Sequence, residues 1–272
     1  MNYLPCRPLR PESRVTSEKA LRFFLADLHI HTVLSACAEI EMLPEFILER
    51  AQRLGLGLIS VTDHNSAENV AAMLAAAEGT GVTVLPGMEV QTREEVHLLC
   101  LFDTLEQVTR WQEEVYAHLP PLKNKEDVFG VQVVLNAEGD LSYNERLLLT
   151  STSLSVEEVV QGVRDLNGLC IPAHVDRPAY SIIANLGFIP PDLGIVGVEI
   201  SHLISLKEAQ TRFPQLERYS LMASSDAHRL KDMAARTTFK MAEATVAEVS
   251  LALAGEGGRT VWVDGICSVR GL

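Results

Sequence analysis

The sequence predicts an α/β fold built as one TIM-like barrel, because short β-rich segments alternate along the chain with amphipathic helical segments. This alternation begins near Phe23 and is typical of parallel strands joined by crossover helices. The length of 272 residues is close to what one closed α/β barrel needs. We therefore expect a mostly parallel sheet in one main domain over residues 23–272, preceded by an N-terminal extension over residues 1–22.

The expected strands are short runs rich in aliphatic and β-branched side chains. They cover residues 23–31, 56–64, 82–90, 95–102, 169–175, 194–201 and 220–228, and a later run over 260–263 closes the set. Residues 43–55 and 66–81 carry apolar side chains at helical spacing and end in glycine, as helices do. Two possible capping boxes, Ser155 with Glu158 and Thr245 with Glu248, predict the start of two further helices.

Residues 103–154 interrupt this alternation. Their first part has the spacing of one helix, but the rest is longer than an ordinary connection between elements. We interpret the segment as an insertion over the mouth of the barrel. Its Lys123, Lys125 and Arg146 can meet a substrate there, although a solvated charged face is the commoner explanation for such residues.

Composition and charge limit the cellular location and the binding partners that we expect. The five cysteines are scattered and lack a C-x-x-C spacing, which favours a reducing compartment. No run approaches the roughly 20 apolar residues of a membrane span, and the N-terminus lacks a secretion signal. We therefore expect a soluble, cytoplasmic protein without a membrane partner. The net charge of −13 disfavours extended binding along duplex DNA and leaves small anions or short oligonucleotides as partners.

The clearest chemical signal is the pair His29 and His31. Side chains two residues apart on a strand point to the same face, so both imidazoles can serve as metal ligands. Asp27 shares this face and can orient a ligand imidazole. The alternative for such a pair is two core or surface histidines.

Other histidines follow the same placement, at or just beyond the ends of apolar runs. Six of the eight do so: His29, His31, His64, His97, His174 and His228. Glu89 and Asp226 also end such runs, and strand ends of a parallel barrel converge at one rim. Because these groups exceed what one tetrahedral zinc uses, we expect two or three divalent ions, with zinc, manganese and iron as candidates.

The ordered motifs resemble those of the polymerase and histidinol phosphatase (PHP) domain family. They are D-x-H-x-H-T at 27–32, T-D-H at 62–64, G-x-E at 87–89, V-H-L-L at 96–99, P-A-H at 172–174 and S-D-A-H at 225–228. The resemblance runs from about Ala26 to His228 and is nearest to the stand-alone phosphoesterases of the family. It implies a distorted seven-stranded (β/α)7 barrel with a trinuclear metal centre that hydrolyses phosphate esters.

The resemblance also implies how the ligands are shared. His29, His31, Glu89 and Asp226 would hold one metal, Glu89 would bridge to a second with His97 and His174, and His64 and His228 would hold the third.

One position departs from the family pattern. Members usually continue H-T-x-x-S-D-G, whereas Ala36 stands here where the ligand aspartate is expected. Glu41 is included in the expected ligand set as its replacement, with Glu39 and the softer ligand Cys37 as alternatives.

A hydroxide held between two divalent ions would be the nucleophile, because no motif for a protein nucleophile is present. Arg177 is the expected phosphate contact, with a salt bridge to Asp176 or a loop carboxylate as the alternative. His202 is a further candidate, as a proton donor or phosphate contact. Asp63 either orients a ligand or caps the following helix.

The resulting hypothesis is a metal-dependent phosphoesterase that acts on a small phosphorylated substrate. The substrate would be a nucleotide or short oligonucleotide, as for a 3′,5′-bisphosphate nucleotidase or a 5′–3′ exonuclease. One alternative is histidinol-phosphate hydrolysis. Another is a metal-stabilised binding or regulatory module without catalysis, which the loss of the aspartate at Ala36 suggests.

Overall fold

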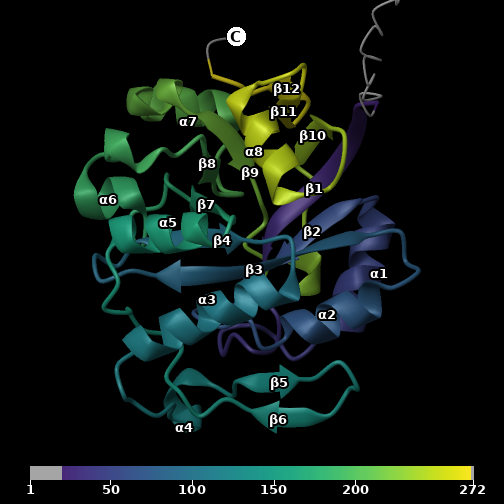
Figure 1. Cartoon of the computed structure of the whole chain (residues 1–272), viewed down its shortest axis with the longest axis vertical. Helices are drawn as coiled ribbons and strands as arrows, with labels where there is room; N and C mark the ends of the chain where they lie inside the picture. Colours follow the sequence, from purple (N-terminus) through teal and green to yellow (C-terminus); the bar gives the residue numbers. More distant parts are fainter. Residues whose placement is uncertain (1–19, 271–272) are drawn as a thin grey trace, which may run out of the picture.

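A curled mixed sheet forms the centre of the structure, a computed structural model that describes residues 20–270. The strands are β1 (Arg22–Ile30), β2 (Leu58–Val61), β3 (Thr83–Gln91), β4 (His97–Leu101), β5 (Val133–Leu135), β6 (Leu141–Tyr143), β7 (Leu169–Pro172), β8 (Gly197–Ile200), β9 (Ser220–Ala223), β10 (Thr237–Met241), β11 (Thr260–Val263) and β12 (Ile266–Cys267). Eight of them form one sheet in the order β12-β11-β10-β1-β2-β3-β4-β7. The separate pair of β8 and β9 lies next to β7 on one side and β11 on the other, so the strands curl into a barrel-like wall (Figure 1).

The helices pack mainly around the outside of this wall. They are α1 (Pro44–Leu54), α2 (Val70–Ala77), α3 (Leu105–His118), α4 (Glu126–Phe129), α5 (Val156–Asp165), α6 (Ile182–Leu186), α7 (Leu206–Arg212) and α8 (Val246–Ala254). The predicted helix over 43–55 is confirmed by α1, and Gly55 ends it in the left-handed conformation. Ser155 and Glu158 form the predicted capping box of α5. None of the helices within residues 20–270 is long and apolar enough to cross a membrane.

The mixed α/β fold agrees with the sequence prediction, but two details differ. The expected count of seven strands is not what the sheet shows, and the prediction of a mostly parallel sheet is wrong. Among the strand pairs of the described residues, three are parallel, namely β1–β2, β2–β3 and β8–β9, and the others are antiparallel. The turn over residues 92–96, which joins β3 to β4, is too short for the crossover connection that a parallel pair requires. The expected N-terminal extension falls mostly on residues 1–19, outside the described residues, and β1 begins at Arg22.

Alternation along the strands separates two apolar regions. On β3, Leu85 lies on the same face as Glu89, because the two residues are four positions apart and strand side chains alternate between faces. Leu85 packs with Leu99 and Ile171 in an apolar cluster on the inner side of the wall, to which α8 also contributes. Val84 belongs to the larger cluster beneath the outer helices. An apolar floor therefore lies on the face of the sheet that carries the polar side chains at the rim.

The segment expected as an insertion divides into two parts. Helix α3 supplies Val108, Trp111 and Val115 to the main core, as the other outer helices do. The β5–β6 hairpin lies beyond α3 at one end of the molecule (Figure 1). Backbone hydrogen bonds join this part to the turn after β1, where Val133 donates to Val33. We infer that the insertion is limited to about residues 119–154.

Two of the basic side chains named in this segment, Lys123 and Arg146, contact other protein groups. Lys123 pairs with Glu145 on the exposed surface, and the Arg146 guanidinium lies 4.4 Å from the ring centroid of Tyr116. These contacts favour the solvated-face explanation for both residues.

A close approach of β2 and β3 positions the end of β3. A Cβ atom at Gly87 would contact Ser60 Oγ and would lie 2.8 Å from Thr62 Cγ2 and 2.9 Å from Val61 O. The last of these atoms is backbone and cannot rotate away. Glycine is therefore required here for steric reasons, two residues before Glu89.

Gly87→Ala should lower the free energy of unfolding by about 1–3 kcal/mol, because the added methyl group overpacks the interface of β2 and β3. The measurement is urea unfolding followed by circular dichroism. The matched control is Gly57→Ala, since a Cβ atom at Gly57 meets nothing within 4 Å. Equal stability of the two variants would contradict the packing argument.

Candidate metal centre

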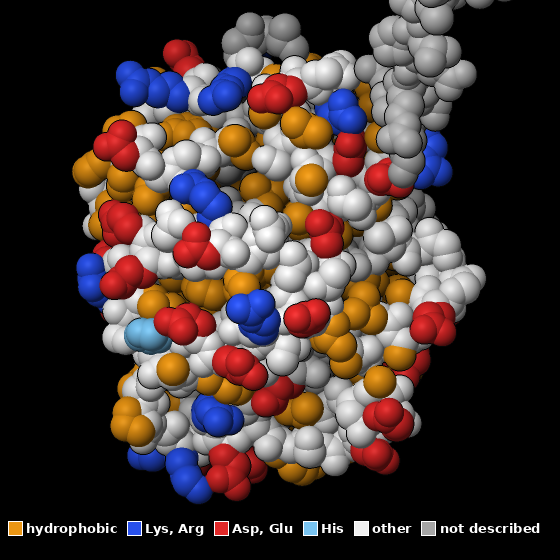
Figure 2. Space-filling model, viewed as in Figure 1, with side chains coloured by type: hydrophobic (Ala, Val, Ile, Leu, Met, Phe, Trp, Pro, Cys, Tyr) orange, Lys and Arg blue, Asp and Glu red, His pale blue; other side chains and the backbone are white. Residues whose placement is uncertain are grey.

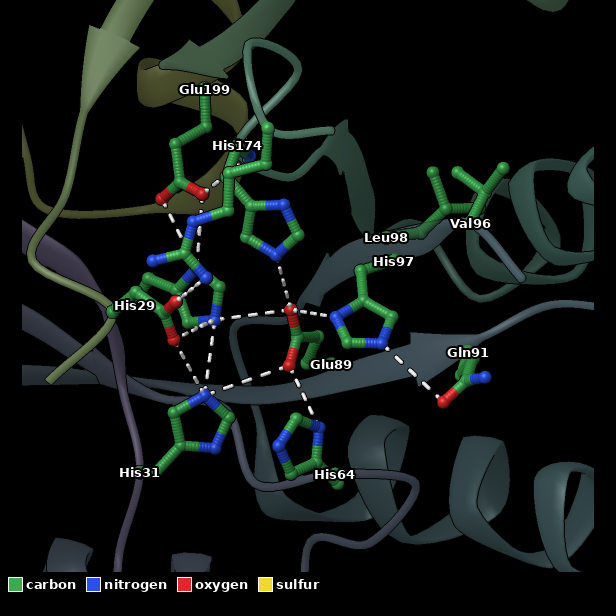
Figure 3. Close-up of polar contacts among 12 residues, drawn as sticks. His29, His31, His64, Glu89, Gln91, Val96, His97, Leu98, His174 and Glu199 are labelled. Carbon is green, nitrogen blue, oxygen red and sulfur yellow. Dashed lines mark hydrogen bonds and ion pairs between the residues drawn. The ribbon is translucent and has the colours of Figure 1, made fainter. Parts of the chain in front are cut away.

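Glu89 lies at the centre of a ring of imidazoles (Figure 3). Its carboxylate is 1% exposed and faces histidines from several elements. The distances from its oxygens are 2.8 Å to His97 Nδ1, 2.9 Å to His64 Nδ1, 3.2 Å to His29 Nε2, 3.2 Å to His174 Nε2 and 3.6 Å to His31 Nε2. Residues separated by up to 145 positions, from His29 to His174, thus meet around one carboxylate.

Asp226 completes a second set of contacts at this place. Its Oδ1 lies 3.3 Å from His29 Nε2 and 3.1 Å from His31 Nε2, and the two nitrogens are 3.2 Å apart. Ligand atoms about 2.0–2.1 Å from a tetrahedral zinc are roughly 3.3 Å from one another. The spacing of these three atoms therefore matches one face of a metal coordination shell.

The far nitrogens of both rings are held in place by hydrogen bonds. His29 Nδ1 lies 3.0 Å from a Glu199 oxygen, and His31 Nδ1 lies 3.0 Å from Ser35 Oγ. A carboxylate only accepts, and Ser35 Oγ donates to Asp63, so each Nδ1 carries a proton and donates it. In each ring Nε2 is then the nitrogen that can serve as a metal ligand.

Two of the clustered residues have left-handed backbone conformations, with φ of 30° at His174 and 51° at Asp226. Such values are uncommon for residues other than glycine and cost free energy unless the surroundings stabilise them. The N–H of His174 donates to Glu199, and the N–H of Ser225, next to Asp226, donates to Asp27. Both strained positions are thus stabilised by buried carboxylates.

The structure brings together eight of the residues predicted as metal ligands: His29, His31, His64, Glu89, His97, His174, Asp226 and His228. We call this set the histidine–carboxylate cluster. His97 comes from the beginning of a strand, not its end. Because β4 runs antiparallel to β3, the start of β4 lies beside the end of β3, and Gln91 pairs with His97.

Four predicted residues occupy other positions. Arg177 forms a salt bridge of 2.7 Å with Asp226, which lies in the loop after β9. This contact matches the alternative of a salt bridge to a loop carboxylate, whereas Asp176 accepts hydrogen bonds from Ser201. Asp63 accepts hydrogen bonds from Thr32 and Ser35 and so contacts the cluster only indirectly.

Glu41 and His202 are not brought into the cluster. The exposed Glu41 carboxylate accepts a hydrogen bond from the backbone N–H of Leu230. His202 is exposed in the turn after β8, and no hydrogen bond or ion pair described within residues 20–270 joins it to the cluster.

Glu199 is a site residue that sequence reasoning missed. One of its oxygens lies 3.0 Å from both His29 Nδ1 and the backbone nitrogen of His174, and its side chain is 1% exposed. In the sequence, Glu199 is an acidic residue at the end of an apolar run. The same pattern identified Glu89. Asp27 also differs from expectation, because its carboxylate accepts from Ser225 and Ala234 and does not bond an imidazole.

The charges of the cluster shift its ionisation equilibria. Burial alone raises the pKa of Glu89, but the imidazoles of His97, His29 and His64 hold the pKa well below its usual range. Burial alone lowers the pKa of His29, but the carboxylates of Glu199, Glu89 and Asp226 raise it well above its usual range. The cluster thus favours positive charge beside its carboxylates. Protons or metal cations can supply this charge.

The donor set fits divalent metals. Within residues 20–270, three overlapping groups can hold an ion: His31, His64 and His228; His29, His31 and Asp226; and His64, Glu89 and His97. Two buried polar atoms of the cluster, Glu89 Oε2 and His174 Nδ1, have no aligned hydrogen-bond partner. Unpaired buried groups of this kind are rare unless a metal or another ligand satisfies them. Imidazole nitrogens with carboxylate oxygens suit zinc, manganese or iron.

The chain is similar to several known proteins. A family model described as PHP domain matches residues 27–183. The fold is similar to that of a lesion-specific endonuclease, PfuEndoQ, from Pyrococcus furiosus, with a TM-score of 0.68 and 23% identity over 88% of this chain and 58% of that chain. Endonuclease Q bound to a 27-mer duplex with an abasic lesion at its active site gives 0.66 and 22%, with the same coverage.

A putative metal-dependent phosphoesterase from Bifidobacterium adolescentis gives a TM-score of 0.51 and 19% identity over 75% of this chain and 87% of that chain. The chain spans 58% of the length of the Endonuclease Q chains. A sequence search of curated proteins found no match. At these identities the solved structures show a shared fold.

Glu199→Gln should weaken zinc binding by about 10- to 100-fold, because the amide cannot serve His29 and His174 as the carboxylate does. The measurement is competition with a chromophoric chelator, with folding checked by circular dichroism. Glu113→Gln, the same change at an exposed position of α3, is the control. Unchanged zinc affinity in Glu199→Gln would show that Glu199 does not orient the ligands.

A pH dependence should follow from Asp27, whose pKa burial raises to about 6 despite the hydrogen bonds from Ser225 and Ala234. Since the pKa of Asp27 in the unfolded chain is about 4, the Asp27 contribution to stability is fully present below pH ~4 and is lost as pH rises through about 6. In metal-free protein, the free energy of unfolding of wild type relative to Asp27→Asn should fall by about 3 kcal/mol over this window. The measurement is urea unfolding at a series of pH values. The same pH dependence of the free energy of unfolding in both proteins would refute the prediction.

Proposed function

This chain belongs to the PHP domain family, and from that premise we propose that it is a metal-dependent hydrolase of phosphate esters. The observation that carries the proposal is the buried histidine–carboxylate cluster around Glu89. When bound there, divalent cations lower the pKa of water and neutralise charge on phosphate oxygens. A hydrolase of this kind needs no protein nucleophile.

The side chains in and around the cluster have different proposed roles. The hydrogen bonds to Glu199 and Ser35 fix the rings of His29 and His31, so that each Nε2 is oriented for a ligand role. Asp226 faces these two rings through Oδ1 and binds Arg177 through Oδ2. This shared carboxylate holds a guanidinium directly beside the proposed reaction site.

Arg177 is the residue proposed to bind the substrate phosphate. Its side chain is 29% exposed and reaches the cluster through a single Nη1 contact of 2.7 Å, so further N–H groups remain for a phosphate. Its buried Nε has no hydrogen-bond partner among the described residues. A planar guanidinium with free donors matches phosphate oxygens in a bidentate way.

We propose a nucleotide or short oligonucleotide as the substrate, cleaved as by a 3′,5′-bisphosphate nucleotidase or a 5′–3′ exonuclease. The resemblance in fold to an endonuclease supports a nucleic-acid substrate. The net charge of −13 favours a short one. Acidic and basic side chains are interspersed over the face in Figure 2, where the described residues form no continuous basic surface.

His29→Ala and Asp226→Ala should each reduce phosphate release to background, because both remove ligand atoms from the same coordination face. The assay is hydrolysis of 3′,5′-bisphosphate nucleotides, short oligonucleotides and histidinol phosphate, with manganese, zinc or iron added. His118→Ala, an equivalent change on the outer surface of α3, should leave activity unchanged.

The substrates separate the alternatives. Preference for histidinol phosphate would replace the nucleotide proposal and keep the metal centre. Folded wild type that binds metal but hydrolyses none of these esters would indicate a metal-stabilised binding module. Activity that survives both substitutions would exclude the cluster as the reaction site.

A further inference from the structure

An exposed tyrosine lies directly against one ring of the histidine–carboxylate cluster. The rings of Tyr180 and His97 are stacked, with centroids 4.8 Å apart and an interplanar angle of 20°. His97 is buried, and its Nδ1 lies 2.8 Å from the Glu89 carboxylate (Figure 3). Tyr180, in contrast, is 47% exposed. One face of the tyrosine ring thus covers a cluster imidazole, while the rest of the side chain is in contact with solvent.

The stack on His97 accounts for only one face of this ring. Within residues 20–270, no other aromatic ring or cation stacks on Tyr180, and its hydroxyl has no hydrogen-bond partner. Neither fold stability nor a polar network of the described residues therefore explains why a large aromatic side chain is exposed here. A flat π surface open to solvent is the feature on which proteins stack the bases of single-stranded nucleic acids.

The backbone holds this ring in place despite local strain. Tyr180 has a φ of 58°, which is a left-handed conformation that bulky residues rarely adopt. The N–H of His97 donates to Tyr180 O at 2.9 Å, and the next residue, Ser181, caps the start of α6. Strained residues of this kind concentrate at ligand-binding sites, where the surrounding structure stabilises them. The strain at Tyr180 therefore points to a role in binding.

Tyr180 shares a short loop with the proposed phosphate contact Arg177. The N–H of Arg177 donates to His174 O at 2.9 Å, and Ser181 Oγ donates to Arg177 O at 2.7 Å. The loop is thus tied to the cluster twice, by the salt bridge of Arg177 with Asp226 and by the stack of Tyr180 on His97. A nucleotide carries a phosphate and a flat base on one sugar. A guanidinium and an aromatic ring three residues apart match these two parts.

We propose that Tyr180 is a stacking platform for the base next to the scissile phosphate, so that this residue determines a preference for nucleotides over phosphate esters without a base. This inference rests on the proposed function and adds the residue that recognises the base. Every base has a π face, so we expect little discrimination among the four bases. The cluster and Arg177 would contact the phosphate, and Tyr180 would contact the base.

Substrate pairs that differ only in the base test this role in the full-length, metal-loaded protein. The pairs are adenosine 3′,5′-bisphosphate with ribose 3,5-bisphosphate, and a 5′-phosphorylated trinucleotide with the same trinucleotide lacking its 5′ base. Tyr180→Ala should raise KM for the base-containing member by about 5- to 100-fold, the loss expected for one stacked base, and leave kcat nearly unchanged. KM for the base-free member should not change, and Tyr180→Phe, which keeps the ring, should behave like wild type.

Phe23→Ala is the matched control variant. Phe23 is also an exposed aromatic residue that lies against another ring, that of Trp262. It lies six residues before His29 on β1, which is roughly 20 Å away along an extended strand. This variant should keep the wild-type KM for both members of each pair.

A binding measurement tests the stack without turnover. Fluorescence anisotropy would compare a labelled 5′-phosphorylated trinucleotide with phosphorothioate linkages, which resist hydrolysis, with its counterpart lacking the 5′ base. Wild type should bind the base-containing form about 5- to 100-fold more tightly, and Tyr180→Ala should bind both forms equally. Equal binding of the two forms by wild type would overturn the proposal.

The kinetic outcomes also separate stacking from a structural role. If Tyr180 only supports the His97 ring, Tyr180→Ala would lower kcat for both members of a pair alike, and this result would overturn the proposal. An unchanged KM for the base-containing substrates would do the same while leaving the phosphoesterase activity established. Wild type that hydrolyses neither member of any pair would refute the proposed function, whereas the binding measurement would still decide whether Tyr180 stacks on a base.

Discussion

A carboxylate buried away from water is costly unless opposite charges or hydrogen bonds replace its hydration. Glu89 meets this constraint through five imidazoles that approach it from different elements. The same rings would repel one another if all were protonated, and burial opposes charge on each of them. Divalent cations satisfy both requirements, because they supply concentrated positive charge and accept lone pairs from nitrogen and oxygen alike. The elements around Glu89 hold the imidazoles in place beside its carboxylate.

The supporting structure works mainly through backbone geometry. The antiparallel hairpin of β3 and β4 places His97 beside the end of β3, and Gly87 permits β2 and β3 to approach closely just before Glu89. His174 and Asp226 have left-handed conformations that present their side chains to the cluster. Buried carboxylates hold the adjoining backbone, so the strain at these positions is offset by hydrogen bonds elsewhere.

The rim of the cluster is chemically uneven, and this bears on what it can bind. One side carries Arg177, which is joined to the cluster through Asp226 and is partly exposed. The imidazoles of His31, His64 and His228 also belong to the cluster, and their ligand atoms lie within 4.8 Å of one another. A small phosphate ester would thus meet a fixed guanidinium on one side.

Much of the site followed from local sequence patterns. The H-x-H spacing of His29 and His31, and polar residues at the ends of apolar runs, were enough to select the residues that the structure brings together. Patterns of this kind report which face of a strand a side chain occupies, and that depends only on neighbouring residues. Strand direction depends on the connection between strands and on pairing partners, and the antiparallel course of β4 was therefore missed.

The sequence by itself determined the α/β class, the positions of most strands and helices, and the ligand types gathered at the strand ends, since each depends on periodicity and side-chain chemistry within a short window. Only the tertiary structure decided that Glu199 supports His29 and His174, that Arg177 binds Asp226, and that the Glu41 carboxylate accepts from Leu230 N. These contacts join residues far apart along the chain. Their distances are set by packing of the whole fold, which no local pattern encodes.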